Sequence, residues 1–174
     1  KKFYEAVEQA DKRIQKIWDA VQYRQKNFNE EWMIVITTDH GRNAERGRDH
    51  GGQSDRERAS WIATNAKKLN QEFTEGNTSL ADIMPSIAVF MNIPVPKENA
   101  MEIDGISFKG KIAAMQPSAK KEGDKITVQW KAIEKKGTAK IWVAVTNNFK
   151  TGGKDEYKLV KEVPVAKGHA EIDV

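Results

Sequence analysis

Residues 32–52 read WMIVITTDHGRNAERGRDHGG, and this stretch decides how the fold of the chain is interpreted. Its first five residues, 32–36, are apolar and do not alternate with polar residues. Such a run is typical of a strand in a parallel sheet that helices cover on both faces. It gives way to the Asp-His-Gly of residues 39–41, and a second His-Gly begins at His50. Ligands of open α/β sheets bind beyond the carboxyl ends of the strands, so we expect a site here.

The composition limits both the size of the fold and the chemistry of any site. A chain of 174 residues with 39% hydrophobic residues and five tryptophans can form one domain or two small ones. No run approaches the roughly 18 apolar residues that a membrane span needs. The sequence contains no cysteine, so disulfides and thiolate metal sites are excluded, and any metal must be held by His, Asp, Glu or hydroxyl groups.

The net charge of +4 is unevenly distributed along the chain. The excess lies after residue 116, where 12 lysines accompany 8 acidic residues and no arginine occurs. Lysines spread over alternating segments are typical of a solvated face, and the chain contains no recognisable nucleic-acid-binding motif.

Two amphipathic helices are predicted in the first part of the chain. One set of apolar residues recurs at three- and four-residue steps and predicts a helix packed on a sheet, ended by Asn27 and Asn29. A second set predicts a helix near residues 80–91, with Ser79 and Asp82 as its N-terminal capping pair. The first set is Phe3, Val7, Ala10, Ile14, Ile17 and Val21, and the second is Leu80, Ile83, Met84, Ile87, Ala88 and Met91.

The segments between and after these helices are predicted as follows. Residues 41–55 are polar and glycine-rich and indicate a long loop at the end of the strand. Residues 59–64 are expected to form a short buried strand, and the polar residues 67–75 are expected to cross the surface.

After about residue 107 the pattern changes to short alternating strands separated by glycines, which predicts a small antiparallel sandwich. We place a domain boundary near residue 116, which divides the chain into 1–116 and 117–174. Trp130, Trp142 and Tyr157 are expected to pack in the core of this sandwich, with a carbohydrate-binding face as the alternative. His169 is out of phase with its apolar neighbours and is expected to face solvent.

The candidate metal ligands are Asp39, His40 and His50. Adjacent residues of a strand point to opposite faces, so Asp39 and His40 can share a site only where the chain has left strand geometry. A carboxylate and an imidazole are good ligands for zinc and similar divalent ions, and His50 can bind the same ion or a neighbouring one. The alternative is that Asp39 and His40 only cap the strand end while His50 lies on an exposed loop.

Three stretches together resemble a known family: IVITTDHG at residues 34–41, HGG at 50–52 and LADIMPSIAVFMNIPVP at 80–96. In this order they look like the C-terminal half of the catalytic domain of the alkaline phosphatase superfamily. Within it they most resemble the phosphodiesterase/nucleotide pyrophosphatase-like phosphatases. The resemblance covers about residues 1–107 and implies part of a doubly wound α/β sheet.

The resemblance implies that Asp39 and His40 bind one of two divalent ions, expected to be zinc, and that His50 binds the other. In the family, the Thr or Ser nucleophile, a further metal-binding Asp and an Asp-x-x-x-His pair lie earlier in the chain. None of them occurs here, so no catalytic nucleophile is assigned. We therefore expect the chain to be the C-terminal piece of a larger enzyme and to be inactive alone.

Arg42 is a weaker candidate, because a guanidinium matches the oxygens of an anionic substrate well. Arg46 and Arg48 lie on the same loop, and ion pairing with Glu45 and Asp49 is the alternative role for all three arginines.

The resulting hypothesis is a C-terminal fragment of a metal-dependent phosphoric-ester hydrolase, either a phosphatase or a phosphodiesterase, acting on a small phosphate ester. It is followed by an accessory domain similar to immunoglobulin or fibronectin III sandwiches. The alternatives are a sulfatase, or a non-catalytic binding module with a remnant metal site. By analogy with the family we expect a periplasmic or extracellular location.

Overall fold

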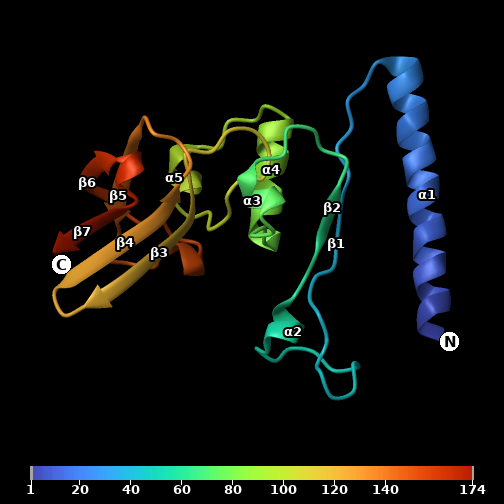
Figure 1. The fold of residues 1–174 in the computed structure, drawn as a ribbon, viewed down its shortest axis with the longest axis horizontal. Helices are drawn as coiled ribbons and strands as arrows, with labels where there is room; N and C mark the ends of the chain where they lie inside the picture. Colours follow the sequence, from blue (N-terminus) through green and yellow to red (C-terminus); the bar gives the residue numbers. More distant parts are fainter. Residues whose placement is uncertain (1, 174) are drawn as a thin grey trace. The chain divides into compact units, whose positions relative to one another are not determined.

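A computed structural model describes residues 2–173 as helices and small antiparallel sheets (Figure 1). The chain forms two compact units that divide after Ile34, and each is described by itself. No helix within the described residues has the length and apolar character needed to cross a bilayer. The helices are α1 (Lys2–Phe28), α2 (Asp55–Arg58), α3 (Gln71–Thr74), α4 (Ile83–Phe90) and α5 (Lys97–Ala100), with 3₁₀ turns η1 (Leu80–Asp82), η2 (Phe149–Thr151) and η3 (Val165–Lys167). The strands are β1 (Val35–Thr37), β2 (Ile62–Thr64), β3 (Ala114–Glu122), β4 (Lys125–Ala132), β5 (Thr138–Val143), β6 (Lys158–Pro164) and β7 (His169–Asp173).

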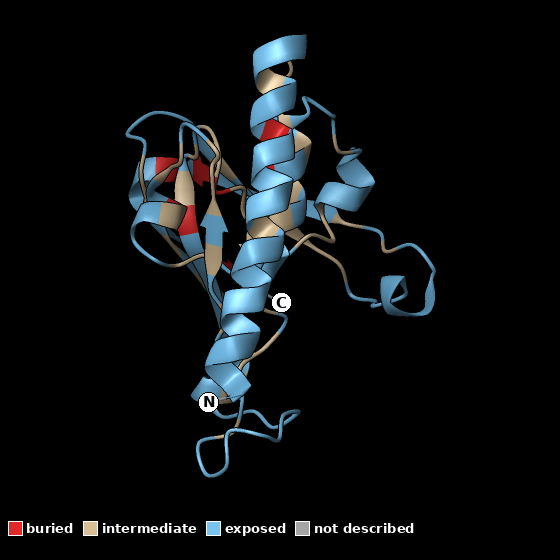
Figure 2. Ribbon diagram, turned by 90° about the vertical axis from the view of Figure 1, so that its right-hand side faces the viewer, coloured by how far each residue is buried: buried red, intermediate tan, exposed pale blue. Residues whose placement is uncertain are grey.

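The first unit consists of α1 and the segment that follows it. The predicted helix is confirmed and ends at Phe28, after which Asn29 adopts a left-handed conformation with φ 53°. The carboxylate of Glu30 accepts hydrogen bonds from Arg24 and from the indole N–H of Trp32, and these bonds lower the pKa of Glu30 to about 2. Most of α1 is exposed (Figure 2), so its packing on a sheet stays a prediction.

The strand expected at residues 32–36 differs from the prediction. The regular strand β1 covers only residues 35–37, and it pairs antiparallel with β2 rather than parallel. None of residues 32–36 is buried. The chain between β1 and β2 returns as one long loop and brings β2 back beside β1 in the opposite direction. Within the described residues this sheet has only two strands, which leaves its apolar side chains half-buried.

The second unit is built around the extended segment 105–109. The Asp82 carboxylate accepts the backbone N–H of Ile106 (2.6 Å) and that of Ser79 (2.6 Å), which confirms the predicted capping pair. The Ser86 hydroxyl donates to the Asp82 carbonyl (2.6 Å) and accepts the N–H of Phe108 (2.9 Å). Both polar side chains and Phe108 are buried. Hydrogen bonds to two buried side chains therefore fix α4 against this segment.

The same segment also holds α3. Asn70, the N-cap of α3, donates its amide to the Ser107 carbonyl (2.7 Å), and its backbone N–H donates to the Phe108 carbonyl (3.0 Å). The rings of Phe73 and Phe108 lie 5.6 Å apart between their centroids. Segment 105–109 is thus hydrogen-bonded both to α4 with its preceding turn η1 and to the N-cap of α3, and it joins these helices.

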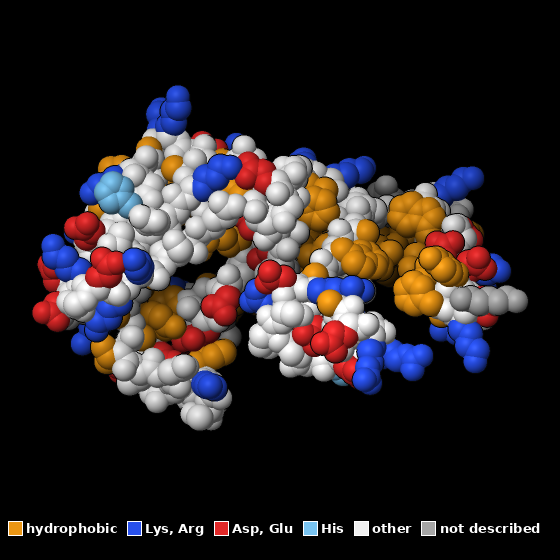
Figure 3. All heavy atoms as spheres, turned by 60° about the horizontal axis from the view of Figure 1, so that its bottom comes forward, with side chains coloured by type: hydrophobic (Ala, Val, Ile, Leu, Met, Phe, Trp, Pro, Cys, Tyr) orange, Lys and Arg blue, Asp and Glu red, His pale blue; other side chains and the backbone are white. Residues whose placement is uncertain are grey.

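The buried face of α4 is not the one that its apolar spacing predicts. Ser86 is fully buried, whereas Met84 is 49% exposed and Ile87 is 39% exposed. The need to satisfy the buried N–H of Phe108 turns the polar side of the helix inward. Apolar side chains of α4 are exposed as a result. Figure 3 shows that hydrophobic side chains reach the surface on one face of the molecule.

The C-terminal strands form two antiparallel sheets, β3-β4-β7 and β5-β6. The predicted alternation is confirmed in β7, where Ala170 and Ile172 are buried and His169 is exposed. The other buried apolar residues of this region are Met115, Val163 and Val165. Small antiparallel sheets are thus established, with alternating burial in β7, and the sandwich arrangement stays a prediction.

Strand β3 has no counterpart among the predicted strands. It contains the expected boundary near residue 116, which stays a prediction. The ladder to β4 is interrupted between Met115 and Ser118, where Gln116 has a positive φ of 53°. Pro117 lies within this bulge and cannot donate a ladder hydrogen bond, which is tolerated because β3 is the outer strand of its sheet.

Replacing Ser86 with Ala should destabilise the second unit. The substitution removes the acceptor of the buried Phe108 N–H, and leaving such a group unpaired costs about 1–3 kcal/mol. We expect a lower midpoint in urea denaturation for Ser86→Ala, and no comparable change for Ser118→Ala, an exposed serine on β3. Equal midpoints for the two variants would contradict the anchoring role of Ser86.

Glu72 is a buried carboxylate in α3, although residues 67–75 were expected to cross the surface. Its Oε2 has no hydrogen-bond partner among the described residues. Burial raises the pKa of Glu72, and the nearby Asp82 and Glu75 carboxylates raise it further. The charged form of this residue therefore opposes folding.

We expect Glu72→Gln to be more stable than the parent chain at pH 7, by about 1 kcal/mol. Because the pKa is raised in the folded state, the parent chain loses stability as the pH rises from the unfolded pKa through the folded pKa. The difference in stability between Glu72→Gln and the parent chain should therefore shrink as the pH falls toward and below the unfolded pKa of Glu72. Urea denaturation at pH 7 and pH 4 checks both points, with the exposed Glu45→Gln as control. A variant that is less stable at pH 7 would refute the expectation.

Candidate functional site

The candidate site begins where β1 ends. Asp39 and His40 follow the strand in irregular backbone. The backbone N–H of His40 donates to Asp39 Oδ1 (3.0 Å), and Asp39 Oδ2 lies 3.5 Å from His40 Nε2. The two side chains thus approach each other where the chain has left strand geometry, and their role as metal ligands stays a prediction.

His50 joins this pair from the far end of the loop. The imidazole rings of His40 and His50 lie 4.3 Å apart between their centroids, edge to face at 72°. His50 is exposed, and the side chain of His40 retains 35% of its exposure. His40 therefore lies beside both Asp39 and His50, although ten residues separate the two histidines.

An inner closure shapes the loop between the histidines. The N–H of Asn43 donates to the carbonyl of Asp49 (2.9 Å), and Asn43 Oδ1 accepts the N–H of Gly47 (2.9 Å). Arg42 donates from Nη1 to the carbonyl of Arg48 (2.6 Å). Arg42 thus has a structural partner on its own loop, and its contact with an anionic substrate stays a prediction.

An outer closure runs through α2. Ser54 is the N-cap of α2 and accepts the N–H of Glu57 (3.3 Å). The carbonyl of Glu57 accepts the N–H of Gly41 (2.8 Å), and its side-chain Oε1 accepts the N–H of Gly52 (3.1 Å). Glu57 Oε2 accepts the hydroxyl of Ser54 (2.6 Å). The Ser54 hydroxyl is the main cause of a lowered pKa of Glu57, with smaller contributions from the Gly52 N–H and the charge of His50.

Two of the glycines in the His-Gly motifs make close contacts with this closure. A Cβ on Gly41 would overlap the backbone carbonyl oxygen of Arg56, so a side chain there would push α2 away from the loop. A Cβ on Gly52 would lie 2.5 Å from Glu57 Oε2, so the Glu57 carboxylate would have to move.

The side chains present do not form a complete metal centre. Within residues 2–173 there is no group of three or more His, Cys, Asp or Glu side chains arranged to hold an ion. Zinc sites in proteins generally use three or four protein ligands around one ion. Asp39, His40 and His50 are neighbours, but by themselves they do not satisfy this requirement.

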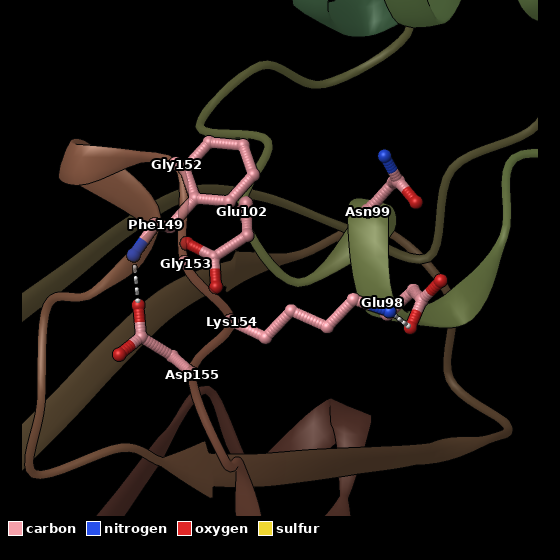
Figure 4. Close-up of a pocket in the computed structure, with 8 residues that line it drawn as sticks. All are labelled: Glu98, Asn99, Glu102, Phe149, Gly152, Gly153, Lys154 and Asp155. Carbon is pink, nitrogen blue, oxygen red and sulfur yellow. Dashed lines mark hydrogen bonds and ion pairs between the residues drawn. The ribbon is translucent and has the colours of Figure 1, made fainter.

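A separate hollow of about 320 Å³ lies between α5 and the loop that contains η2 (Figure 4). Lys154 and Glu98 form an ion pair across it, with 3.0 Å between Nζ and Oε2. Asp155 orders the loop, because its carboxylate accepts the N–H groups of Asn148 (2.8 Å) and Phe149 (3.0 Å). The lining residues are Glu98, Asn99, Glu102, Phe149, Gly152, Gly153, Lys154 and Asp155.

An adjoining hollow of about 430 Å³ is lined in part by Trp142 and Tyr157. Lys97 Nζ lies 4.1 Å from the ring centroid of Trp142, a cation–π distance. Burial raises the pKa of Tyr157, as does its hydrogen bond with Glu102. By contrast, Trp130 donates its indole N–H to the Val165 carbonyl (2.7 Å) within the strand region. The three aromatic residues therefore do not share one face.

Comparisons with protein families, with curated proteins and with solved structures find no match to this chain. The site is accordingly defined by its own residues. Sequence reasoning located Asp39, His40 and His50 but missed Asn43 and Glu57. The pattern Ser54-x-x-Glu57, a known helix-capping signature, was the signal that could have identified Glu57.

Replacing Gly41 with Ala should separate the two histidines. The added Cβ overlaps the Arg56 carbonyl, so the hydrogen bond from the Gly41 N–H to Glu57 cannot form. We expect the nuclear Overhauser effect between the His40 and His50 ring protons to be lost. Gly47→Asn is a matched control, because nothing lies near its added Cβ and Asn tolerates the positive φ of 63°. An unchanged effect in Gly41→Ala would show that the contact with α2 does not set the histidine geometry.

Proposed function

We propose that this chain carries part of the two-metal centre of a phosphoric-ester hydrolase, either a phosphatase or a phosphodiesterase. The observation that supports this most directly is the approach of two imidazoles to 4.3 Å at the end of β1, next to the carboxylate of Asp39. The resemblance of the Asp-His-Gly and His-Gly-Gly stretches to the alkaline phosphatase superfamily supports the same chemistry.

Asp39 and His40 would hold one divalent ion, expected to be zinc, and His50 its neighbour. When bound, paired ions of this kind stabilise negative charge on the oxygens around phosphorus. The ligands on this chain are too few for two ions, so we assign the missing ligands and the nucleophile to another part of a larger enzyme. The isolated chain is expected to hydrolyse no phosphate ester.

The proposal extends to the fold and the surroundings of the intact enzyme. The half-buried strand β1 would belong to a doubly wound α/β sheet, and the strands from β3 to β7 to an immunoglobulin- or fibronectin III-like accessory domain. The substrate would be a small phosphate ester, with Arg42 near its anionic group. A periplasmic or extracellular location follows by family analogy alone.

Two other functions remain as alternatives. A sulfatase would use a similar strand-end motif. The two activities are separated by assaying a longer protein that includes this chain with nitrophenyl sulfate and with nitrophenyl phosphate. A non-catalytic binding module is supported by one observation. An exposed lysine, Lys97, reaches the ring of Trp142 in the hollow beside α5, so this ring is accessible from solvent.

Metal titration of the isolated chain tests the proposal. We expect Co²⁺ or Zn²⁺ to bind, and His40→Ala or His50→Ala to weaken the affinity at least about tenfold, or 1.4 kcal/mol, because each removes an imidazole ligand. His169→Ala is the matched control, since His169 is the third histidine of the chain and lies exposed on β7. Absence of metal binding at millimolar ion concentration, or equal losses in all three variants, would refute the proposed centre.

A further inference from the structure

We infer that Glu57 is the positioning residue that holds His40 and His50 side by side. The role assigned to the histidines as metal ligands rests on the proposed function. The closeness of the two imidazole rings does not depend on that function, because it is a geometric property of the loop and of α2.

Glu57 binds both His-Gly motifs at once, through different parts of the same residue. Its backbone carbonyl accepts the N–H of Gly41, the residue after His40. Its carboxylate accepts the N–H of Gly52, two residues after His50. A single residue of α2 therefore fixes the backbone next to each imidazole.

The carboxylate of Glu57 is itself held in place. Its second oxygen accepts the Ser54 hydroxyl at 2.6 Å, while the backbone N–H of Glu57 donates to the same hydroxyl oxygen. Hydrogen bonds to an ionised carboxylate are about twice as strong as neutral ones. With both oxygens engaged by donors, Glu57 is suited to fixing the loop rather than to binding an ion directly.

No buried apolar side chain orders the loop between the histidines, because residues 44–50 are all exposed. The inner closure joins Asn43 to Asp49, the residue before His50, but makes no bond to Gly41 or Gly52. The outer closure through Glu57 holds these two glycines, which follow the histidines in sequence. The distance between the two imidazoles therefore depends on both closures, and Glu57 supplies the outer one.

A metal-free proximity measurement tests this inference. The chain has no cysteine, so the double variant His40→Cys/His50→Cys contains only two thiols. We expect a short bifunctional thiol reagent to cross-link them rapidly within one molecule. Adding Glu57→Ala should slow this cross-linking at least about tenfold, whereas Glu57→Gln, which keeps an acceptor oxygen, should slow it less. Glu45→Ala, which removes an exposed carboxylate from the same loop, should leave the rate unchanged.

The midpoint of urea denaturation, measured in parallel, should be the same with and without Glu57→Ala, which distinguishes positioning from general destabilisation. If Glu57→Ala proves unfolded, Ser54→Ala is the second variant. It removes the hydroxyl that steadies the carboxylate and caps α2 while it leaves the Glu57 carboxylate in place, and we expect a slowing of a few-fold. Equal cross-linking rates with and without the Glu57 or Ser54 substitution would overturn the inference. So would a parent double variant that does not cross-link.

Metal titration of Glu57→Ala with both histidines intact separates this inference from the proposed function. Weaker Co²⁺ binding than in the parent chain supports both. Cross-linking that depends on Glu57 in a chain that binds no metal refutes the metal centre and retains the positioning role. If the chain binds metal but Glu57→Ala does not change the cross-linking rate, only the positioning role is refuted.

Discussion

The hydrogen bonds that the backbone of segment 105–109 donates to Asp82 and Ser86 are the constraint that orients α4. The bond from the Phe108 N–H to Ser86 is buried, and a buried N–H without a partner is costly, so α4 can rotate little about its own axis without losing it. The apolar side chains Met84 and Ile87 are turned outward as a result. Asp82 and Ser86 therefore have a structural function in this chain. Gly105 contributes to the same contact, since a Cβ at that position would overlap the carbonyl of Ala81.

Periodic apolar spacing predicted the elements whose local sequence is sufficient to specify them. The helix from residue 2 to 28 and the alternation in β7 were found this way, and the capping pair at Ser79 and Asp82 was found from its own local signature. Spacing failed where a partner elsewhere in the chain decides the outcome. The inward face of α4 is set by the backbone of Phe108, and the antiparallel pairing of β1 is set by where the following loop returns. Strand β3 was missed because Pro117 and its polar neighbours do not resemble a strand until β4 pairs with them.

The candidate site shows the same contrast. A sequence motif identified the candidate ligands, whereas the residues that position them became apparent only in the structure. Asp39, His40 and His50 were recognisable by residue type and by their position after an apolar run. The residues that bring them together, Asn43 and Glu57, act through hydrogen bonds to backbone groups, and such bonds impose no periodic spacing on the sequence. Gly41 illustrates this, since it was visible as part of a motif while the contact with the Arg56 carbonyl that requires it to be glycine was not. The apolar stretch before the motif predicted a fully buried strand, and β1 is only half-buried because one neighbour alone pairs with it in the described chain.

The bulge in β3 affects how copies of this protein interact with one another. An exposed outer strand presents a row of backbone donors and acceptors on which a strand of another molecule can assemble. Here the row is broken, because Gln116 bends the backbone with its positive φ and Pro117 lacks an N–H. Lys121 follows on the same strand and adds a positive charge to this edge, whereas the charge of Lys120 is offset by an ion pair with Glu122 (2.6 Å). This side of the sheet is thereby protected against edge-to-edge aggregation, and the protection weakens at high salt, where the charge of Lys121 is screened and only the broken hydrogen-bonding row remains.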